Sequence, residues 1–486
     1  MQRRHFLSHT GKALSAAALL GTSPTWSQIA TLNPAASLEQ KLADFALSLR
    51  YETLPPEVVS TVKRIVIDTF ACALGAVGSE AATIAEGTVR GTFGAGQAAT
   101  VIGAARSATV EGAVFVNGIL VRTLDLNDTY LGTEPLHPSE LLPTALAICE
   151  EGKRSGRDFI TALVAGYEAS TRITDAVSFI ERGFHPLCSM AYAAPLIAGR
   201  LWDLKQQALT NAVGLSAARG YTSFVVNSGA ISMMKAMGFA ASAVDAIFVT
   251  RLAAKGFTGP TGTLAWFASR AGSAKATVSV DLDPARYRLP KVAFKRFPIQ
   301  IELAAAAEAG SSLSSRLRDR IGQIRNINVK TYPGIIERVA DAAKFRPQTR
   351  GTADHSLPIC LAMALLDGDV TLEQFEKDRW RQSDVMGLVE KTTVMPHTAL
   401  MAKIPKGRGA TVEVTFVDGT MLSETVEVPE GDSQRPLSRA SLERKFMTAA
   451  TPVLGGTAAK RVIAQIDSLD TLADVGDLAR MLKVSA

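Results

Sequence analysis

The sequence predicts a mainly α-helical protein with a smaller α+β domain. Apolar residues make up 47% of its 486 residues and aromatic residues only 6%, a composition that favours packed helices. Apolar residues recur at helical spacing up to about residue 280, and alternating stretches appear beyond residue 285. We therefore expect an all-helical domain at 29–284, completed by a helical tail at 435–486, and an α+β domain at 285–434.

The start signals of the first two helices are clear. Ser37-Leu38-Glu39-Gln40 has the pattern of a capping box, and apolar residues follow at helical spacing. Pro55-Pro56 opens the next helix, which Gly75 ends. Further helical segments of the first domain are expected at 111–124, 139–152, 158–178, 189–201, 206–218 and 233–255.

The α+β domain is indicated by strand-like stretches at 289–294, 327–330 and 410–417. In the last of these, Val412, Val414 and Phe416 alternate with polar residues, and Asp418-Gly419 forms a hairpin turn toward Val426. Helical segments at 300–317, 334–343 and 356–367 are interleaved, and the tail over 438–484 is helical again.

Charge and cysteine content exclude several classes of protein. The formal charge is +6 without a dense basic run, so a nucleic acid is not an expected partner. Four cysteines in a chain of this length do not form a disulfide framework. The sequence has no P-loop, GxSxG, CxxC or HExxH motif, and its four histidines beyond residue 28 stand far apart in the sequence, so we expect no metal.

Residues 1–28 have the features of an export signal. Arg3-Arg4-His5-Phe6-Leu7 resembles the twin-arginine signature, and a short, weakly apolar stretch and small residues follow. The apolar stretch is too short to be a permanent membrane anchor. The alternative is a basic N-terminus on a cytoplasmic protein. We expect a signal peptide read by the twin-arginine export machinery, and a periplasmic location.

Three stretches concentrate polar groups within apolar helical sequence. The first is Asn117–Thr129, followed by His137-Pro138-Ser139; the second is Gly183-Phe184-His185-Pro186; the third is Ser232–Phe239, which contains Lys235. A lone lysine in so apolar a run is costly unless it is paired. Both histidines precede helices, whose N-termini disfavour an imidazolium. A single such histidine is more often structural, but three stretches together indicate a site.

These strings resemble the MmgE/PrpD family, which contains 2-methylcitrate dehydratase, cis-aconitate decarboxylase and iminodisuccinate epimerase. The resemblance covers about residues 36–450. The strings that carry it, in order, are NGxxxxxLDxND-T…HPS, Gly166-Tyr167-Glu168, RGFHP, Lys235 to Gly238, Gly256–Pro260, Lys295-Arg296-Phe297-Pro298, Ala353-Asp354-His355-Ser356, and Pro436-Leu437-Ser438 with Lys445-Phe446. The resemblance implies a helical domain and an α+β lid domain with a cleft between them, and a homodimer.

The resemblance also implies an active site made of Asp125, Thr129, His137, His185, Lys235 and Lys295, to which we add Arg122 and His355. His137, Asp125, His185 and Lys235 are assigned to catalysis, and Thr129, Lys295, Arg122 and His355 to substrate binding. Proton transfer at a carbon next to a carboxylate needs a base near neutral pKa, which histidine supplies, and fixed cations that spread developing charge. The resemblance implies no metal and no organic cofactor.

The sequence departs from the family pattern at several positions. Arg122 stands where a histidine often precedes the LDxxD string. Ile299-Gln300-Ile301-Glu302 replaces a segment that commonly carries a cysteine and then a histidine, and Ile359 replaces a tyrosine. These changes concern the choice of substrate and the proton donor.

The expected function is that of a cofactor-independent lyase acting on a small di- or tricarboxylate. A dehydratase of the 2-methylcitrate type comes first, and a cis-aconitate-type decarboxylase or an iminodisuccinate-type epimerase is the alternative. A further alternative, from a different class, is a non-catalytic periplasmic carboxylate-binding protein. The retained His137, His185, Lys235 and Lys295 argue against it, and Ile359 argues for it.

Overall fold

Helices dominate the structure, as the sequence predicts. The structure is a computed structural model that describes residues 36–94, 96–270, 278–401 and 408–484. The predicted export signal at 1–28 lies outside the described residues. Within the described part, the helices of the first domain are α2 (Leu38–Ser48), α3 (Pro56–Gly75), α4 (Glu80–Phe93), α5 (Val110–Thr123), α6 (Leu142–Gly152), α7 (Gly156–Ala176), α8 (Met190–Leu201), α9 (Gln206–Arg219), α10 (Met234–Met237), α11 (Ala240–Ala254) and α12 (Thr263–Arg270).

Local signals explain where these helices begin and end. The Ser37 hydroxyl accepts from the backbone N–H of Gln40 and caps α2, while Glu39 caps the start of α12 through Gly262 and Thr263. The predicted helix at 56–75 is confirmed with Gly75 as its last residue. These caps satisfy backbone donors that the first helical turn leaves free.

The prediction of one helix over 233–255 is wrong. The segment breaks into α10 and α11 at Gly238, which has a φ of 28°. A Cβ at this position would lie 2.8 Å from Glu140 Oε2, so the break lets the chain pass close to that carboxylate. The stretch Met234–Ala254 is apolar and long enough to cross a bilayer by composition. However, α11 packs against α5, α8 and α9, as a core helix does.

The first domain is not purely helical, which corrects a second expectation. β1 (Ala99–Thr100) pairs with β2 (Ser107–Ala108), and β3 (Thr129–Leu131) pairs with both β4 (Pro135–Leu136) and β5 (Val292–Ala293). The stretch predicted as a strand at 289–294 therefore contributes only two residues, and these pair with β3 rather than with the sheet of the α+β domain. Strands this short carry no alternation that a sequence pattern can show.

The α+β region holds a four-stranded sheet with the order β7-β6-β8-β9. Its strands are β6 (Ile324–Thr331), β7 (Thr392–Pro396), β8 (Ala410–Phe416) and β9 (Met421–Val426). The predicted hairpin at Asp418-Gly419 is confirmed, with Gly419 at a φ of 83°. β6 pairs antiparallel with β8 and parallel with β7, a strand that the sequence pattern did not indicate.

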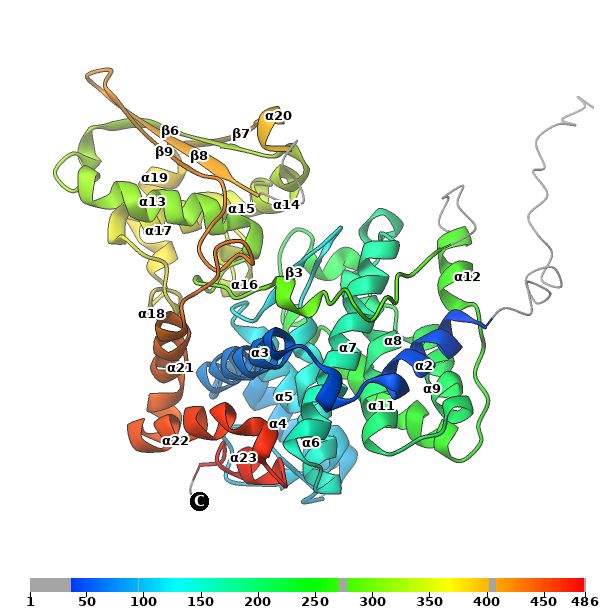
Figure 1. Cartoon of the computed structure of the whole chain (residues 1–486). Coiled ribbons are helices and arrows are strands. Elements are labelled where there is room, and N and C mark those ends of the chain that lie inside the picture. Colours follow the sequence, from blue (N-terminus) through cyan, green and yellow to red (C-terminus); the bar gives the residue numbers. More distant parts are fainter. Residues whose placement is uncertain (1–35, 95, 271–277, 402–407, 485–486) are drawn as a thin grey trace, which may run out of the picture. The chain divides into compact units, whose positions relative to one another are not determined.

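Helices cover one face of this sheet (Figure 1). α13 (Ala304–Leu317) packs on β8 and β9 and against α17 (Leu357–Asp367). The other helices of this region are α14 (Ile336–Val339), α15 (Ala342–Phe345), α16 (Arg350–Ala353), α18 (Leu372–Glu376), α19 (Ser383–Val389) and α20 (Thr398–Met401). The chain then returns through α21 (Arg439–Leu454), α22 (Gly456–Asp467) and α23 (Gly476–Arg480), and α21 packs along α3.

Two hydrophobic cores result from this arrangement. One runs from Leu42 to Phe294 and takes in Leu437–Leu482 from the C-terminal helices. The other runs from Phe297 to Val426. The chain passes from the first core to the second at Lys295 and Arg296, so Lys295 lies where the two cores meet. The domain boundaries at 284/285 and 434/435 stay a prediction.

Candidate active site

A tight turn at the end of α5 forms the centre of the site. Leu124 closes the helix, and Asp125 takes a left-handed conformation with a φ of 50°, which aspartate tolerates better than most residues. The turn brings the Asp125 carboxylate to Arg122 on the last turn of α5, and Arg122 Nη1 donates to Asp125 Oδ1. Both side chains are buried, so this ion pair is shielded from water.

Asp125 gathers positive groups from three other segments. Its Oδ1 lies 3.1 Å from Lys295 Nζ and 3.6 Å from Lys235 Nζ, and its Oδ2 lies 3.8 Å from His355 Nε2. Burial opposes ionisation, but the charges of Lys235, Lys295 and Arg122 outweigh it and hold the pKa of Asp125 well below its usual value. Among the described residues, Asp125 Oδ2 has no hydrogen-bond donor.

His137 offers one free ring nitrogen to the pocket. Its Nδ1 lies 2.7 Å from the backbone oxygen of Asp128, which can only accept, so Nδ1 carries the proton and Nε2 holds the lone pair. Burial, and then the charges of Arg122 and Lys295, lower the pKa of His137 well below its usual value. The ring is therefore neutral at pH 7. We predicted that a helix N-terminus would keep this ring neutral, but burial and neighbouring cations are the causes in the structure.

Thr129 and Asp128 hold His137 in place. Thr129 Oγ1 lies 3.2 Å from His137 Nδ1. The Asp128 carboxylate accepts from the Ser139 backbone N–H at 3.1 Å and from the Tyr167 hydroxyl at 2.8 Å. We revise the assignment of Thr129 to substrate binding, because this fully buried residue does not line the pocket. It acts on His137 instead.

His185 lines the same pocket with both ring nitrogens engaged. Nδ1 accepts from the Leu187 backbone N–H at 3.1 Å, so the neutral ring carries its proton on Nε2. Nε2 lies 2.9 Å from the side-chain amide of Asn227, whose Oδ1 otherwise has no partner. An amide orientation that turns Oδ1 to the Nε2–H satisfies both groups. Burial, then Arg122 and Lys235, lowers the pKa of His185 to about 3, so this ring is neutral at pH 7 as His137 is. It differs from His137 in that its Nε2 is engaged by Asn227.

Lys295 is placed differently from the prediction. Its ammonium donates to the backbone oxygens of Asp125 at 2.7 Å and of Ile299 at 3.1 Å, and it pairs with the Asp125 carboxylate. All three of its protons are thus directed at protein acceptors, and the residue does not line the pocket. We revise its role from binding substrate to holding Asp125. Burial, then Arg122 and Lys235, lowers the pKa of Lys295 to about 8 although Asp125 opposes the shift.

Lys235 and His355 share a second buried carboxylate. Asp354 Oδ1 lies 2.6 Å from His355 Nδ1 and 3.8 Å from Lys235 Nζ. Asp125, Asp354 and His355 place three potential metal-donor atoms within 4.8 Å of one another. However, the Lys235 ammonium lies against both carboxylates, so a lysine takes the position that a divalent cation would need. This donor set fits a metal poorly.

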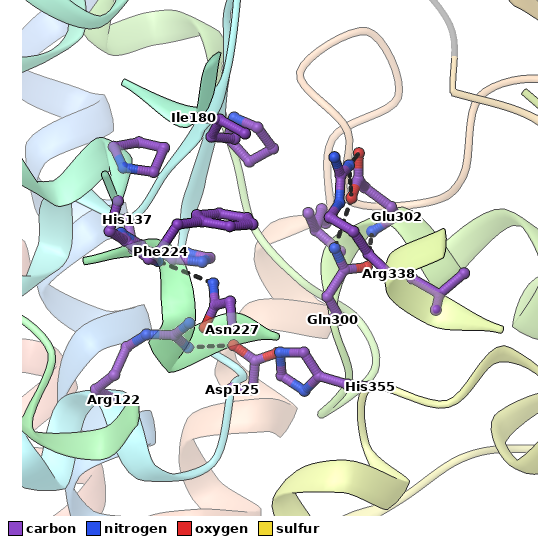
Figure 2. Close-up of a pocket in the computed structure, with 15 residues that line it drawn as sticks. Arg122, Asp125, His137, Ile180, Phe224, Asn227, Gln300, Glu302, Arg338 and His355 are labelled. Atoms are coloured by element: carbon purple, nitrogen blue, oxygen red, sulfur yellow. Dashed lines mark hydrogen bonds and ion pairs between the residues drawn. The ribbon is translucent and has the colours of Figure 1, made fainter. Parts of the chain in front are cut away.

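The pocket has a second wall that the sequence did not reveal. Gln300, Glu302 and Arg338 face the side that carries Arg122, Asp125 and His137 (Figure 2). The remaining lining is mostly apolar: Pro135, Ile180, Pro186, Phe224, Ile301 and Val339. Gln300 and Glu302 stand in the segment that departs from the family pattern. Asn227 and Arg338 lie outside all of the sequence motifs described above.

Two further motif residues support the site from behind. Lys445 on α21 donates to the buried Asp68 carboxylate at 2.5 Å and to the backbone oxygens of Leu126 and Lys295. This lysine therefore ties α3, the turn after α5 and the start of the α+β region together. Glu168 similarly accepts from the backbone N–H groups of Arg288 and Leu289 on the way to β5.

The fold and the site together define a class of protein. It has a helical region and an α+β region that share one pocket, lined by a neutral histidine and backed by buried cations. The N-terminal domain model of the MmgE/PrpD family matches residues 40–280, and the C-terminal domain model matches residues 297–471. The chain belongs to the MmgE/PrpD family, as the sequence motifs indicated.

Curated relatives are similar over most of the chain. A cis-aconitate decarboxylase-like protein of Aspergillus oryzae is 25% identical over 92% of this chain and 98% of its own. The human cis-aconitate decarboxylase is 24% identical over 92% of this chain and 95% of its own. The 2-methylcitrate dehydratase of Escherichia coli is 23% identical over 80% of this chain and 84% of its own.

Proposed function

We propose that this protein is a cofactor-independent lyase that moves a proton at a carbon next to a carboxylate of a small di- or tricarboxylate. The observation that carries the proposal is the state of His137. Its Nδ1–H is held by a backbone oxygen, its ring lines the pocket, and no described residue hydrogen-bonds to its Nε2. A neutral imidazole so fixed is a general base. The relatives named above are enzymes, which supports catalysis over a binding protein.

Arg122 supplies the positive charge that the substrate meets first. Its Nη1 pairs with Asp125 and its Nε lies 3.4 Å from Glu140 Oε1, which fixes the guanidinium plane. Nη2 is left for a substrate carboxylate at the pocket wall. Arg122, with Lys235 behind it, stabilises the negative charge that develops when a proton leaves carbon.

His355 is the candidate proton donor. It lies between two carboxylates, with Nδ1 on Asp354 and Nε2 3.8 Å from the unpartnered Asp125 Oδ2. In the protein without substrate, burial and then the charge of Lys235 lower the pKa of His355. A bound polycarboxylate adds negative charge and raises it again. At Nδ1, His137 faces two uncharged groups, the Asp128 backbone oxygen and the Thr129 hydroxyl, so substrate binding favours protonation of His355.

Dehydration uses both histidines. His137 Nε2 takes the proton from the carbon next to a carboxylate, and the electron pair of that C–H bond forms the C=C bond. The C–O bond to the neighbouring hydroxyl breaks, and the leaving oxygen takes the proton of His355 Nε2–H and departs as water. The neutral state of His137 favours this base-led order.

Decarboxylation is the second candidate. It is favoured by the A. oryzae and human relatives named above, which match 92% of this chain against 80% for the E. coli dehydratase. This reaction needs a proton delivered to carbon before carbon dioxide leaves, a task for protonated His355. Epimerisation needs a base on each face of one carbon, and His137 and His355 are the pair available for it.

Proton NMR in heavy water tests the proposal. Purified protein is incubated with citrate, 2-methylcitrate, cis-aconitate and an aminodicarboxylate. We expect solvent deuterium at a carbon next to a carboxylate in at least one compound, and vinyl signals if water is eliminated. Line broadening with no exchange and no product in any compound would instead identify a carboxylate-binding protein.

We further propose export and self-association. Replacing Arg3 and Arg4 with lysine should leave the precursor in the cytoplasm, whereas the wild type should appear in the periplasm shortened by about 27 residues; unchanged export would contradict the first proposal. The exposed apolar side chains Phe248 and Phe257 support a homodimer. Light scattering at micromolar concentration tests this, and a monomer mass would contradict it.

A further inference from the structure

The wall formed by Gln300, Glu302 and Arg338 is built around one fully paired carboxylate. Glu302 is 6% exposed and lies in a short 3-10 helix over Ile301–Leu303. Arg338 Nη2 donates to its two oxygens at 2.9 and 2.8 Å, the Tyr332 hydroxyl donates at 2.8 Å, and Gln300 Nε2 donates at 2.6 Å. With this many donors, Glu302 is neither a free base nor an unbalanced charge facing the substrate.

The same contacts leave half of the Arg338 guanidinium unused. Both bonds to Glu302 come from Nη2, and the described residues provide no acceptor for Nε or Nη1. The Arg338 side chain is 29% exposed, and the residue lines the pocket. Glu302 therefore fixes a planar cation in one orientation and leaves two N–H edges available.

Arg122 has the same design on the opposite wall. Buried Asp125 and Glu140 hold it through Nη1 and Nε, and the part of the chain that the structure describes provides no acceptor for Nη2. The pocket thus presents two guanidinium groups from opposite sides, and six of its other thirteen lining residues are apolar. Guanidinium groups match carboxylates in planar, bidentate geometry, and an apolar surrounding strengthens the pairing.

We propose that Arg338 binds a second carboxylate of the substrate, distant from the one held by Arg122, and so selects polycarboxylates over monocarboxylates. This inference rests on the proposed function, and in it the α+β wall binds the second carboxylate of the substrate. Glu302 is a positioning residue that acts through Arg338. Gln300 continues the same chain of hydrogen bonds.

The test is isothermal titration calorimetry at pH 7 with the full chain. The probes are propane-1,2,3-tricarboxylate, which lacks a leaving hydroxyl, and butanoate, which has one carboxylate. Losing a hydrogen-bonded charge pair costs roughly tenfold to a hundredfold in affinity. We expect Arg338→Met to weaken tricarboxylate binding by that amount and to leave butanoate binding within about twofold. Arg338→Lys keeps the charge, loses the planar fork and should fall between.

Two further variants make the result specific. Arg320→Met is the matched control, because Arg320 is 33% exposed and ion-paired with Asp418 but does not line the pocket; it should bind both probes as the wild type does. Glu302→Gln keeps the side-chain shape but releases Arg338, so it should weaken only the tricarboxylate. A melting curve for each variant confirms folding.

The outcomes separate the two proposals. If Arg338→Met binds the tricarboxylate like the wild type, or loses both probes equally, the role of Arg338 is overturned while deuterium exchange by the wild type still supports the lyase. If the wild type binds neither probe and exchanges no substrate proton, the proposed function itself fails.

Discussion

The two walls of the pocket contrast in how their charges are arranged. On the helical wall, Arg122 pairs with Asp125, and Lys235 and Lys295, which do not line the pocket, approach the same carboxylate. Glu140 pairs with Arg122 and Asp354 with Lys235, so three cations and three carboxylates form one shared network. On the α+β wall, Glu302 and Arg338 form a one-to-one pair with every oxygen of Glu302 satisfied.

The contrast separates chemistry from selection. A wall whose cations are fixed around a neutral base lowers the energy of a carbanion, because its charges are in place before the reaction begins. A wall with a balanced, preoriented pair changes little during the reaction and binds substrate and transition state alike. We infer that the helical wall sets the rate and the α+β wall sets the substrate.

The largest effect is expected from His137. His137→Gln removes the free Nε2 lone pair and should lower kcat by about a hundredfold or more with little change in KM, the usual scale for a general base. Steady-state kinetics on the compound found by deuterium exchange gives the result. His185→Gln is the comparison, since both nitrogens of that ring are occupied; an equal loss in the two variants would assign the base to neither.

Removing Lys235 should affect both stability and rate. Lys235→Met leaves Asp125 and Asp354 with less compensation in a buried site, and we expect a loss of about 3 kcal/mol in the free energy of unfolding, with lower kcat. Lys344→Met is the control, because Lys344 is also buried but pairs with Asp341 rather than with Asp125 and Asp354. Full activity of Lys235→Met would show that Lys235 does not contribute to catalysis.

Lys295 should appear in the pH dependence of the rate. Its pKa of about 8 means that it loses its charge above that pH, and Asp125 then loses a partner. We expect kcat/KM to be flat near pH 7 and to fall above about pH 8. Lys295→Arg stays protonated and should move this fall to higher pH. An alkaline limb that does not move would mean that another group causes it.

A smaller effect concerns His185 and acid stability. In the unfolded chain its pKa is about 6.5, and in the folded protein it is about 3. Between these values the unfolded state binds the extra proton, so the free energy of unfolding falls as the pH drops below about 6.5. His185→Gln should lose about 2 kcal/mol less than the wild type between pH 7 and pH 5 in urea unfolding. Parallel losses would show that His185 is not buried as a neutral ring.

Local sequence patterns predicted the helical elements well, and the motifs indicated the family. Neither shows which residues far apart in the sequence come into contact. The helix ended by Gly75 and the turn at Asp418-Gly419 follow from residues adjacent in sequence. β3 pairs not only with the adjacent β4 but also with β5, more than 160 residues later. Asp125, His137 and His355 were found by motif, but nothing local shows that Lys295 is saturated or that Arg338 reaches the pocket.

The different roles of the two walls are tested most directly by comparing His137→Gln and Arg338→Met in the same two assays. Deuterium exchange at saturating substrate and calorimetric binding of propane-1,2,3-tricarboxylate are measured for each protein. We predict that His137→Gln loses exchange and keeps binding, while Arg338→Met loses binding and keeps exchange at saturation. The reverse result, or the same loss of both properties in both variants, would contradict the account.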